Sequence, residues 1–167
     1  MSSISIVAKQ FALQTRLFNN VLEDIEEAKS NTRLSDQVNH LRWIAGHLTN
    51  TRYNAAPMLG LQQSYPYKHL FSDASLPPPS TKAIDETIDY PSLKETLEYW
   101  NSFSGPFVNA VAGITDEQTA GELPFGTPIG DKTLIGYFGF LTSHESCHIG
   151  QMSIIRKYLG LGAMSYK

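Results

Sequence analysis

Apolar residues recur at alternating steps of three and four along most of this chain. Such a period puts one apolar stripe along a helix. Four segments show it, with approximate limits 3–30, 35–60, 91–113 and 133–159. The stripe of the first segment consists of Ile4, Val7, Phe11, Phe18, Val21, Ile25 and Ala28. Strand-like runs with turn signals do not compete with these helices, so we expect an all-α fold.

Helix-starting and helix-breaking residues set the expected limits. Ser35 is the expected N-cap of the second helix, because a serine oxygen accepts a hydrogen bond from a free helical N–H. Pro57 should kink or end that helix, and the Gly105-Pro106 pair should kink the third helix or divide it. Gly160 suits the residue just beyond the fourth helix.

The connections between these segments predict a topology. The first, 31–34, is short, so the first two helices should be antiparallel neighbours. The second, 61–90, includes Pro77-Pro78-Pro79 and is long enough to cross the whole bundle, which allows the second and third helices to run parallel. The third, 115–132, is rich in glycine and proline and should be an ordered loop. We therefore expect a four-helix bundle with a long crossover between the second and third helices.

Length and charge limit the class of protein. The chain has 167 residues, which is the length of one ordinary domain, so 1–167 is expected to be a single domain. Hydrophobic residues make up 41% and charged residues 17% of the chain. Such a composition excludes a disordered chain. The 13 basic and 16 acidic residues give a net charge of −3. A weakly acidic chain has a poor basis for binding nucleic acid.

Cysteine content and hydropathy exclude other classes. A single cysteine, Cys147, excludes a disulfide framework and a cysteine-based zinc site. The longest apolar-looking run, 134–141, is far shorter than a membrane span, which takes ~20 residues. The N-terminus has no basic region before an apolar core, so no signal peptide is expected. We expect a cytoplasmic protein that binds neither membrane nor nucleic acid.

The stretch with the clearest chemistry is His144-Glu145-Ser146-Cys147-His148. Residues four apart on a helix share a face, so His144 and His148 can chelate a divalent metal. The pattern is also the H-E-x-x-H signature of zinc proteases. Those enzymes need a third ligand, which usually follows the motif. The tail 149–167 has no His, Asp or Glu, so the protease interpretation lacks its ligand and the third must come from upstream.

Three upstream histidines remain as candidates. His47 lies beside the apolar stripe of the second segment and should face the core or its margin, where the fourth helix passes. His40 is two turns earlier, about 10 Å away, so it can share a face with His47 but not a metal. His69 lies in the long connection, and nothing about its neighbours marks it. A single histidine on an apolar face is more often a core residue than a ligand.

The chain resembles the DinB-like (DinB/YfiT) superfamily of small bacterial four-helix proteins. The resemblance is carried by the motifs His144-Glu145-x-x-His148-x-Gly150-Gln151, Ile155-Arg156, Leu159-Gly160 and Trp43-Ile44-x-Gly46-His47. It implies a divalent-metal site on His47, His144 and His148, with zinc or nickel as the expected metal and iron as a further option. Characterised relatives transfer low-molecular-weight bacterial thiols to electrophiles, or use such a thiol to isomerise maleylpyruvate. Many other members have no known activity.

The resemblance implies a metal-dependent thiol S-transferase or a related thiol-assisted enzyme. A low-molecular-weight thiol and an electrophile are then its expected small-molecule partners. Glu145 is the candidate catalytic residue, as a proton acceptor or as support for a ligand. Gln151 is expected to fix a ligand ring or a bound water. Thr51 and Asn54 share the face of His47, and Tyr137 precedes His144 by seven residues, so these three are expected to line the pocket.

Other interpretations stay open. The same triad fits a non-catalytic metal-binding stress or sensor protein, and the bundle fits a dimerisation module. An exposed apolar stripe on the first or third helix would favour association, and the resemblance implies a bundle of a type that often pairs, so a homodimer is expected. Glu145 also fits a solvated helix position, and Arg52 is expected to pair with a carboxylate of the bundle. Cys147 turns about 100° away from its neighbouring histidine and is expected to be a small buried side chain.

Overall fold

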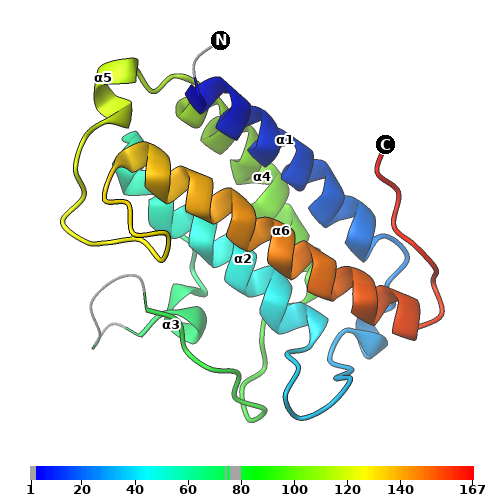
Figure 1. Ribbon diagram of the computed structural model, residues 1–167. Helices are drawn as coiled ribbons and strands as arrows, with labels where there is room; N and C mark the ends of the chain where they lie inside the picture. The colour runs from blue at the N-terminus through cyan, green and yellow to red at the C-terminus, as the bar shows by residue number, and fades with distance from the viewer. Residues whose placement is uncertain (1–2, 74, 76–79) are drawn as a thin grey trace.

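Four long helices run through the described part of the chain, α1 (Ser3–Leu22), α2 (Leu41–Ala55), α4 (Leu93–Ala112) and α6 (Leu134–Tyr158) (Figure 1). This is a computed structural model that describes residues 3–73, 75 and 80–167, so the Pro77-Pro78-Pro79 run lies outside the described residues. Four shorter elements are η1 (Glu27–Lys29), η2 (Ala56–Leu59), α3 (Lys68–Phe71) and α5 (Asp116–Thr119). The described residues include no strand, only an isolated bridge between Glu122 and Thr133. The predicted all-α class is therefore confirmed.

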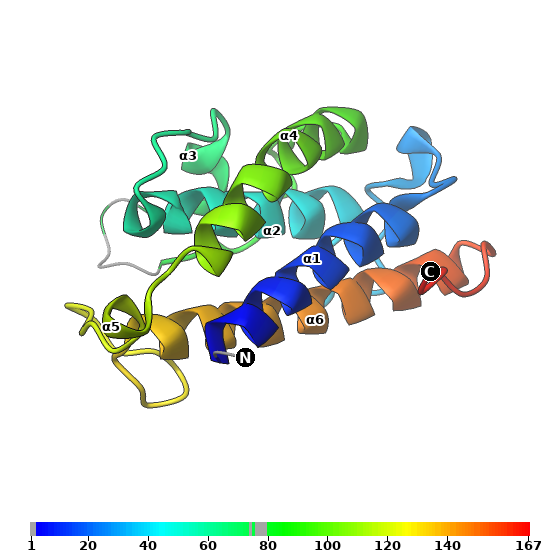
Figure 2. The same ribbon diagram turned by 90° about the horizontal axis from the view of Figure 1, so that it is seen from above.

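The long helices form two pairs. The two helices of each pair run in the same direction, and the two pairs run in opposite directions. α1 and α6 run one way, and α2 and α4 run the other way (Figures 1 and 2). α1 contacts both α4 and α6, and α2 also contacts both. The segments that carry the two histidine motifs, α2 and α6, are therefore neighbours in space although they are far apart in sequence.

The core lies where these helices meet. Apart from Arg52, its largest fully buried side chains are aromatic or aliphatic, and include Phe11, Phe18, Trp100, Phe107 and Phe138. Phe18 of α1 stacks on Trp100 of α4, with ring centroids 3.9 Å apart. Residues of the predicted first stripe from Ile4 to Val21 are buried, which accounts for the orientation of α1.

Two helix limits and one connection differ from the sequence-based expectation. α2 begins at Leu41 rather than near Ser35, because the side chain of His40 caps it. Nδ1 of His40 accepts a hydrogen bond from the Trp43 N–H at 3.1 Å. α1 ends at Leu22, and two residues later Asp24 takes a left-handed φ of 60°. A right-handed helix does not accommodate that conformation. The 115–132 connection, expected to be a loop, contains α5.

α4 passes through Pro106 as one helix. A proline inside a helix leaves the carbonyl four residues earlier without its N–H donor. Here that carbonyl belongs to Ser102, which is exposed, so water can satisfy it. At the other end of the fold, α6 stops as expected, with Gly160 at a φ of 84° just beyond it. Glycine adopts this left-handed conformation without a steric penalty.

Gly46 allows α3 to lie directly against α2. A Cβ at this position would be 2.2 Å from the ring of Phe71, the last residue of α3. Phe71 is fully buried, so its ring has little room to move away. This close approach brings the segment around α3 to the side of α2 that carries His47.

No helix in the described ranges is both long and apolar enough to cross a membrane.

Candidate metal centre

Three histidine side chains converge between α2 and α6. His47 comes from the middle of α2, and His144 and His148 come from successive turns of α6. Each offers one ring nitrogen, and these three nitrogens all lie within 4.8 Å of one another. The Nε2 atoms of His47 and His144 are 3.0 Å apart. We refer to these three residues as the histidine cluster.

Burial keeps the cluster uncharged at neutral pH. His47 is buried and its pKa lies well below 6.5, first because of desolvation and then because of the two neighbouring histidines. Desolvation, with a smaller effect of His148, lowers the pKa of His144 to about 4. Desolvation also lowers the pKa of His148. A neutral imidazole has the free lone pair that metal coordination requires.

Neighbouring side chains hold two of the rings. The indole of Trp43 stacks on His47, with centroids 4.8 Å apart and planes 13° from parallel. Oε1 of Gln151 lies 2.7 Å from Nδ1 of His148. The amide oxygen can only accept, so it takes a hydrogen bond from that ring and leaves Nε2 for the cluster. Contacts of this kind fix the tautomer and orientation of metal-ligating histidines.

The cluster fits a divalent transition metal. Nitrogen ligands bind zinc at about 2.0–2.1 Å, so two ligands of one ion lie about 3–4 Å apart. The 3.0 Å between the Nε2 atoms of His47 and His144 falls in that range, and the three nitrogens lie within 4.8 Å of one another. Imidazole donors suit zinc, nickel, copper and iron and do not suit magnesium or calcium. The Nδ1 atoms of His47 and His144 are buried and have no hydrogen-bond partner within the described ranges.

A cavity of about 810 Å³ opens beside the cluster and is lined by both His47 and His144. The expected pocket residues Thr51, Asn54 and Tyr137 line the same cavity. Gln151 does not line it and instead contacts His148. The geometry thus puts a space for a small molecule next to two of the three candidate ligands.

Several lining residues were not expected from the sequence. They come from α6, from the 125–128 loop and from the segment around α3, and include Phe140, Phe125, Lys68, His69 and Ser72. Phe140 precedes His144 by four residues, so helical spacing was a signal that could have identified it. The residues around α3 carry no such signal, because only the docking of α3 on Gly46 brings them to the cavity.

Glu145 does not face the histidine cluster. Its side chain is fully buried, and both carboxylate oxygens accept hydrogen bonds from Arg52, at 2.7 and 2.8 Å. Burial raises the pKa of the Glu145 carboxyl, and the charge and hydrogen bonds of Arg52 oppose that rise. The orientation of the Glu145 carboxylate towards Arg52 therefore gives no support for Glu145 as a proton acceptor next to the histidine cluster. The expected pairing of Arg52 with a bundle carboxylate is observed.

Cys147 is exposed, contrary to the expectation that it is buried. Glu145 points into the interior, and Cys147 is two residues further along the helix, about 200° around its axis. The thiol therefore lies on the outer face of α6.

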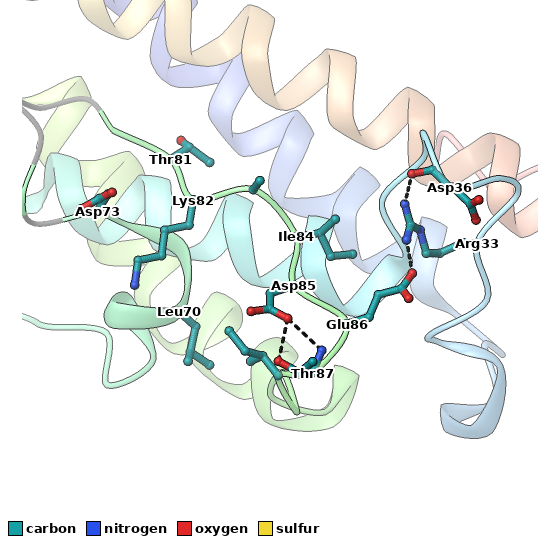
Figure 3. Close-up of a pocket in the computed structure, with 12 residues that line it drawn as sticks. Arg33, Asp36, Leu70, Asp73, Thr81, Lys82, Ile84, Asp85, Glu86 and Thr87 are labelled. Atoms are coloured by element: carbon teal, nitrogen blue, oxygen red, sulfur yellow. Dashed lines mark hydrogen bonds and ion pairs between the residues drawn. The ribbon is translucent and has the colours of Figure 1, made fainter.

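A second hollow, of about 980 Å³, lies on the outside of the protein beside the 81–88 segment (Figure 3). Its charged side chains bind close neighbours: Arg33 pairs with Glu86, and Asp85 accepts hydrogen bonds from Thr87. It shares no residue with the histidine cluster. We therefore assign the candidate site to the cavity on His47 and His144.

A helical protein with three converging histidines and an adjoining cavity fits the class of metal-binding proteins. The profile of the DinB superfamily matches residues 10–152, and the chain belongs to this superfamily. Among solved structures it is similar to a conserved protein from Enterococcus faecalis, with a TM-score of 0.69 and 14% identity. That similarity covers 94% of this chain and 96% of the other, and it concerns the fold. A search of curated proteins found no match.

Proposed function

We propose that this protein is a metal-dependent enzyme that joins a low-molecular-weight thiol to an electrophile, or uses the thiol in a related reaction. His47, His144 and His148 would hold the metal. The observation that carries the proposal is the cavity against His47 and His144, because a purely structural metal site is normally enclosed by its ligands. A divalent ion bound there would supply Lewis acidity and lower the pKa of a nearby thiol.

The rest of the cavity supports binding of a polar thiol. The α2 wall continues from His47 through Thr51 to Asn54, along one face of the helix. Lys68 lies at the same cavity, and its ammonium suits a carboxylate on the thiol compound. In this proposal Gln151 orients His148, and Glu145 acts on the fold through Arg52.

The domain organisation is part of the same proposal. We propose that residues 1–167 form one DinB-like four-helix bundle with a long crossover between α2 and α4. The core supports it, because buried residues from Ile4 to Met164 belong to one connected cluster. A bacterial cytoplasmic location fits the exposed thiol of Cys147, since reducing compartments keep such thiols free.

We further propose a homodimer. Large apolar side chains are exposed on the outer faces of two long helices, with Ile6 and Leu13 on α1 and Ile154 and Tyr158 on α6. Light scattering across a range of concentrations tests this part, and a monomeric mass throughout contradicts it.

A thiol-consumption assay tests the enzymatic function. Metal-loaded protein is mixed with cysteine or glutathione and with 1-chloro-2,4-dinitrobenzene, and the coloured thioether is followed. We expect turnover that is lost in His144→Ala and retained in Gln10→Ala, since Gln10 is exposed on α1 and belongs neither to the cavity lining nor to the cluster. Tight metal binding without turnover for any thiol supports a non-catalytic metal-binding protein instead.

A further inference from the structure

The two sides of the cavity differ in chemistry. The side formed by α6 and the 125–128 loop is apolar and mainly aromatic, with Phe125, Pro128, Tyr137, Phe140 and Leu141. Most of the other lining residues, from α2 and the segment around α3, carry amide, hydroxyl, imidazole or charged groups, with Met58 and Pro66 as apolar exceptions. A ligand that fills the cavity therefore meets a polar surface on one side and an aromatic surface on the other.

The aromatic side begins at the histidine cluster. Phe140 lies one turn before His144 on α6, and their ring centroids are 6.0 Å apart. Tyr137 lies almost one further turn away, and its ring meets that of Phe125 edge to face at 5.7 Å. Phe125 and Phe140 are only half-buried, unlike the fully buried phenylalanines of the core. Part of the surface of each of these two rings is therefore accessible to a ligand.

Tyr137 adds one hydrogen-bond donor to this apolar side. Burial raises the pKa of its hydroxyl to about 12, so the group stays protonated at neutral pH. Desolvation is the cause of this shift, and hydrogen bonding to a described residue does not contribute. The O–H can therefore donate to an acceptor oxygen on a ligand.

We propose that this aromatic wall, formed by Phe125, Tyr137 and Phe140, is the subsite for the electrophile. The wall fits a flat aromatic compound that carries an acceptor oxygen for the Tyr137 hydroxyl. The ring of such a compound would lie along Phe140, next to His144, where a thiol on the polar side can reach it. The role as electrophile rests on the proposed function, whereas binding of the ring depends only on the wall.

Equilibrium binding of an unreactive probe tests this inference. 1,3-Dinitrobenzene has a flat ring and acceptor oxygens but no leaving group, so it measures binding without turnover. It is titrated into metal-free and metal-loaded protein and followed by calorimetry, with acetamide as a small polar comparison. We expect one saturable site for the dinitrobenzene in both forms and none for acetamide.

Matched variants assign that binding to the wall. Phe140→Leu keeps an apolar side chain and removes the ring, and we expect it to weaken binding about three- to tenfold. Tyr137→Phe removes only the hydroxyl and should weaken binding about two- to tenfold. Tyr166→Phe removes an exposed hydroxyl near the C-terminus and should change nothing.

The outcomes separate this inference from the proposed function. Absence of saturable binding, or equal affinity in the parent protein and in both wall variants, overturns the aromatic subsite. If the parent protein binds dinitrobenzene but binds no metal or shows no turnover, the proposed enzymatic function is overturned. The aromatic wall then remains a binding site for flat aromatic compounds.

Discussion

Arg52 holds Glu145 through a two-point ion pair in the centre of the protein, with Nε 2.7 Å from Oε1 and Nη2 2.8 Å from Oε2. The remaining guanidinium hydrogens go to Thr15 Oγ1, to Ser104 Oγ and to the Phe11 carbonyl. All five N–H groups of the arginine therefore have acceptors. These acceptors lie on α1, α4 and α6, so the pair joins every long helix to α2.

Breaking this ion pair should lower the stability of the fold and leave the rate of turnover of the folded protein unchanged. Glu145→Gln or Arg52→Met leaves one buried group without its counter-charge, which typically costs about 3–5 kcal/mol in the free energy of unfolding. Urea denaturation measures this loss. The double variant Arg52→Met/Glu145→Gln should lose less than the sum of the two single losses, because neither charge is then left alone.

The same variants test Glu145 as a proton acceptor. If Glu145 acts only through the fold, the folded fraction of Glu145→Gln turns over within about a factor of three of the parent rate. Loss of a general base typically slows turnover about a hundredfold or more. A fall of that size at unchanged stability would restore a catalytic role.

The histidine cluster should bind about one equivalent of a divalent transition metal. Elemental analysis of tag-free protein, dialysed against zinc or nickel, measures this. His144→Ala and His47→Ala each remove one of three ligands and should lose the metal. His69→Ala is the matched control and should retain it. Equal metal content in all four proteins contradicts the assignment.

Gln151 should affect metal affinity without binding the metal. Removal of a partner that orients a ligating histidine typically lowers metal affinity about 10–100-fold. We expect that loss in Gln151→Ala, measured by competition with a chromogenic chelator. Gln151→Glu keeps an acceptor oxygen for His148 Nδ1 and should recover most of the affinity. An exposed glutamine elsewhere, Gln10 on α1, provides the control when changed to alanine.

Gly46→Ala should loosen the segment that forms one side of the cavity. The added Cβ meets the ring of Phe71 at 2.2 Å. Overpacking of this kind costs about 1–3 kcal/mol. Gly139→Ala is the control, because a Cβ there meets nothing within 4 Å. Alanine inside a helix is favoured over glycine by about 0.5–1 kcal/mol. Thermal denaturation should thus shift in opposite directions for the two variants.

A second change checks the cause of the Gly46 effect. In the background of Gly46→Ala, Phe71→Leu removes the ring atoms that the Cβ meets. The double variant should then be more stable than the sum of the two single losses predicts. Strict additivity would mean that the ring of Phe71 is not what requires glycine at position 46.

Stability of the metal-free protein should fall on acidification because of His40. Burial and nearby arginines lower its pKa from 6.5 to about 4. Between those values the unfolded chain binds a proton more readily than the folded one. The contribution of neutral His40 is complete above pH 6.5 and is lost as pH falls towards 4. We expect a loss of up to about 3 kcal/mol, since one unit of pKa corresponds to about 1.4 kcal/mol.

The cluster histidines also have lowered pKa values, so they too reduce stability as the pH falls. The variant His40→Asn separates the contribution of His40 from theirs. Asparagine can cap α2 and does not titrate. Urea denaturation at neutral pH and at a pH close to the lowered pKa should show a smaller pH-dependent loss in His40→Asn than in the parent. An identical loss in both proteins would remove His40 as a cause.

The local features of this protein follow from its amino-acid sequence alone. The three–four period of apolar residues predicts the long helices and the buried face of α1, since that period follows from the number of residues per helical turn. The same geometry puts His144 and His148 on one face. The family motifs supplied His47 as the third member of the triad. These inferences depend on the order of residues and on the geometry of a single helix, and neither of these requires contacts between helices.

Tertiary packing decided the rest. His47 and His144 are separated by 97 positions, and only the contact of α2 with α6 brings their nitrogens to 3.0 Å. Helical spacing puts Glu145 next to a candidate ligand, but its orientation towards Arg52 depends on how α2 packs against α6. The polar side of the cavity likewise depends on Phe71 resting against Gly46. Such contacts join residues that are far apart in the sequence. Burial of apolar surface drives them, and this effect acts between all parts of the chain, not only between residues that are close in sequence.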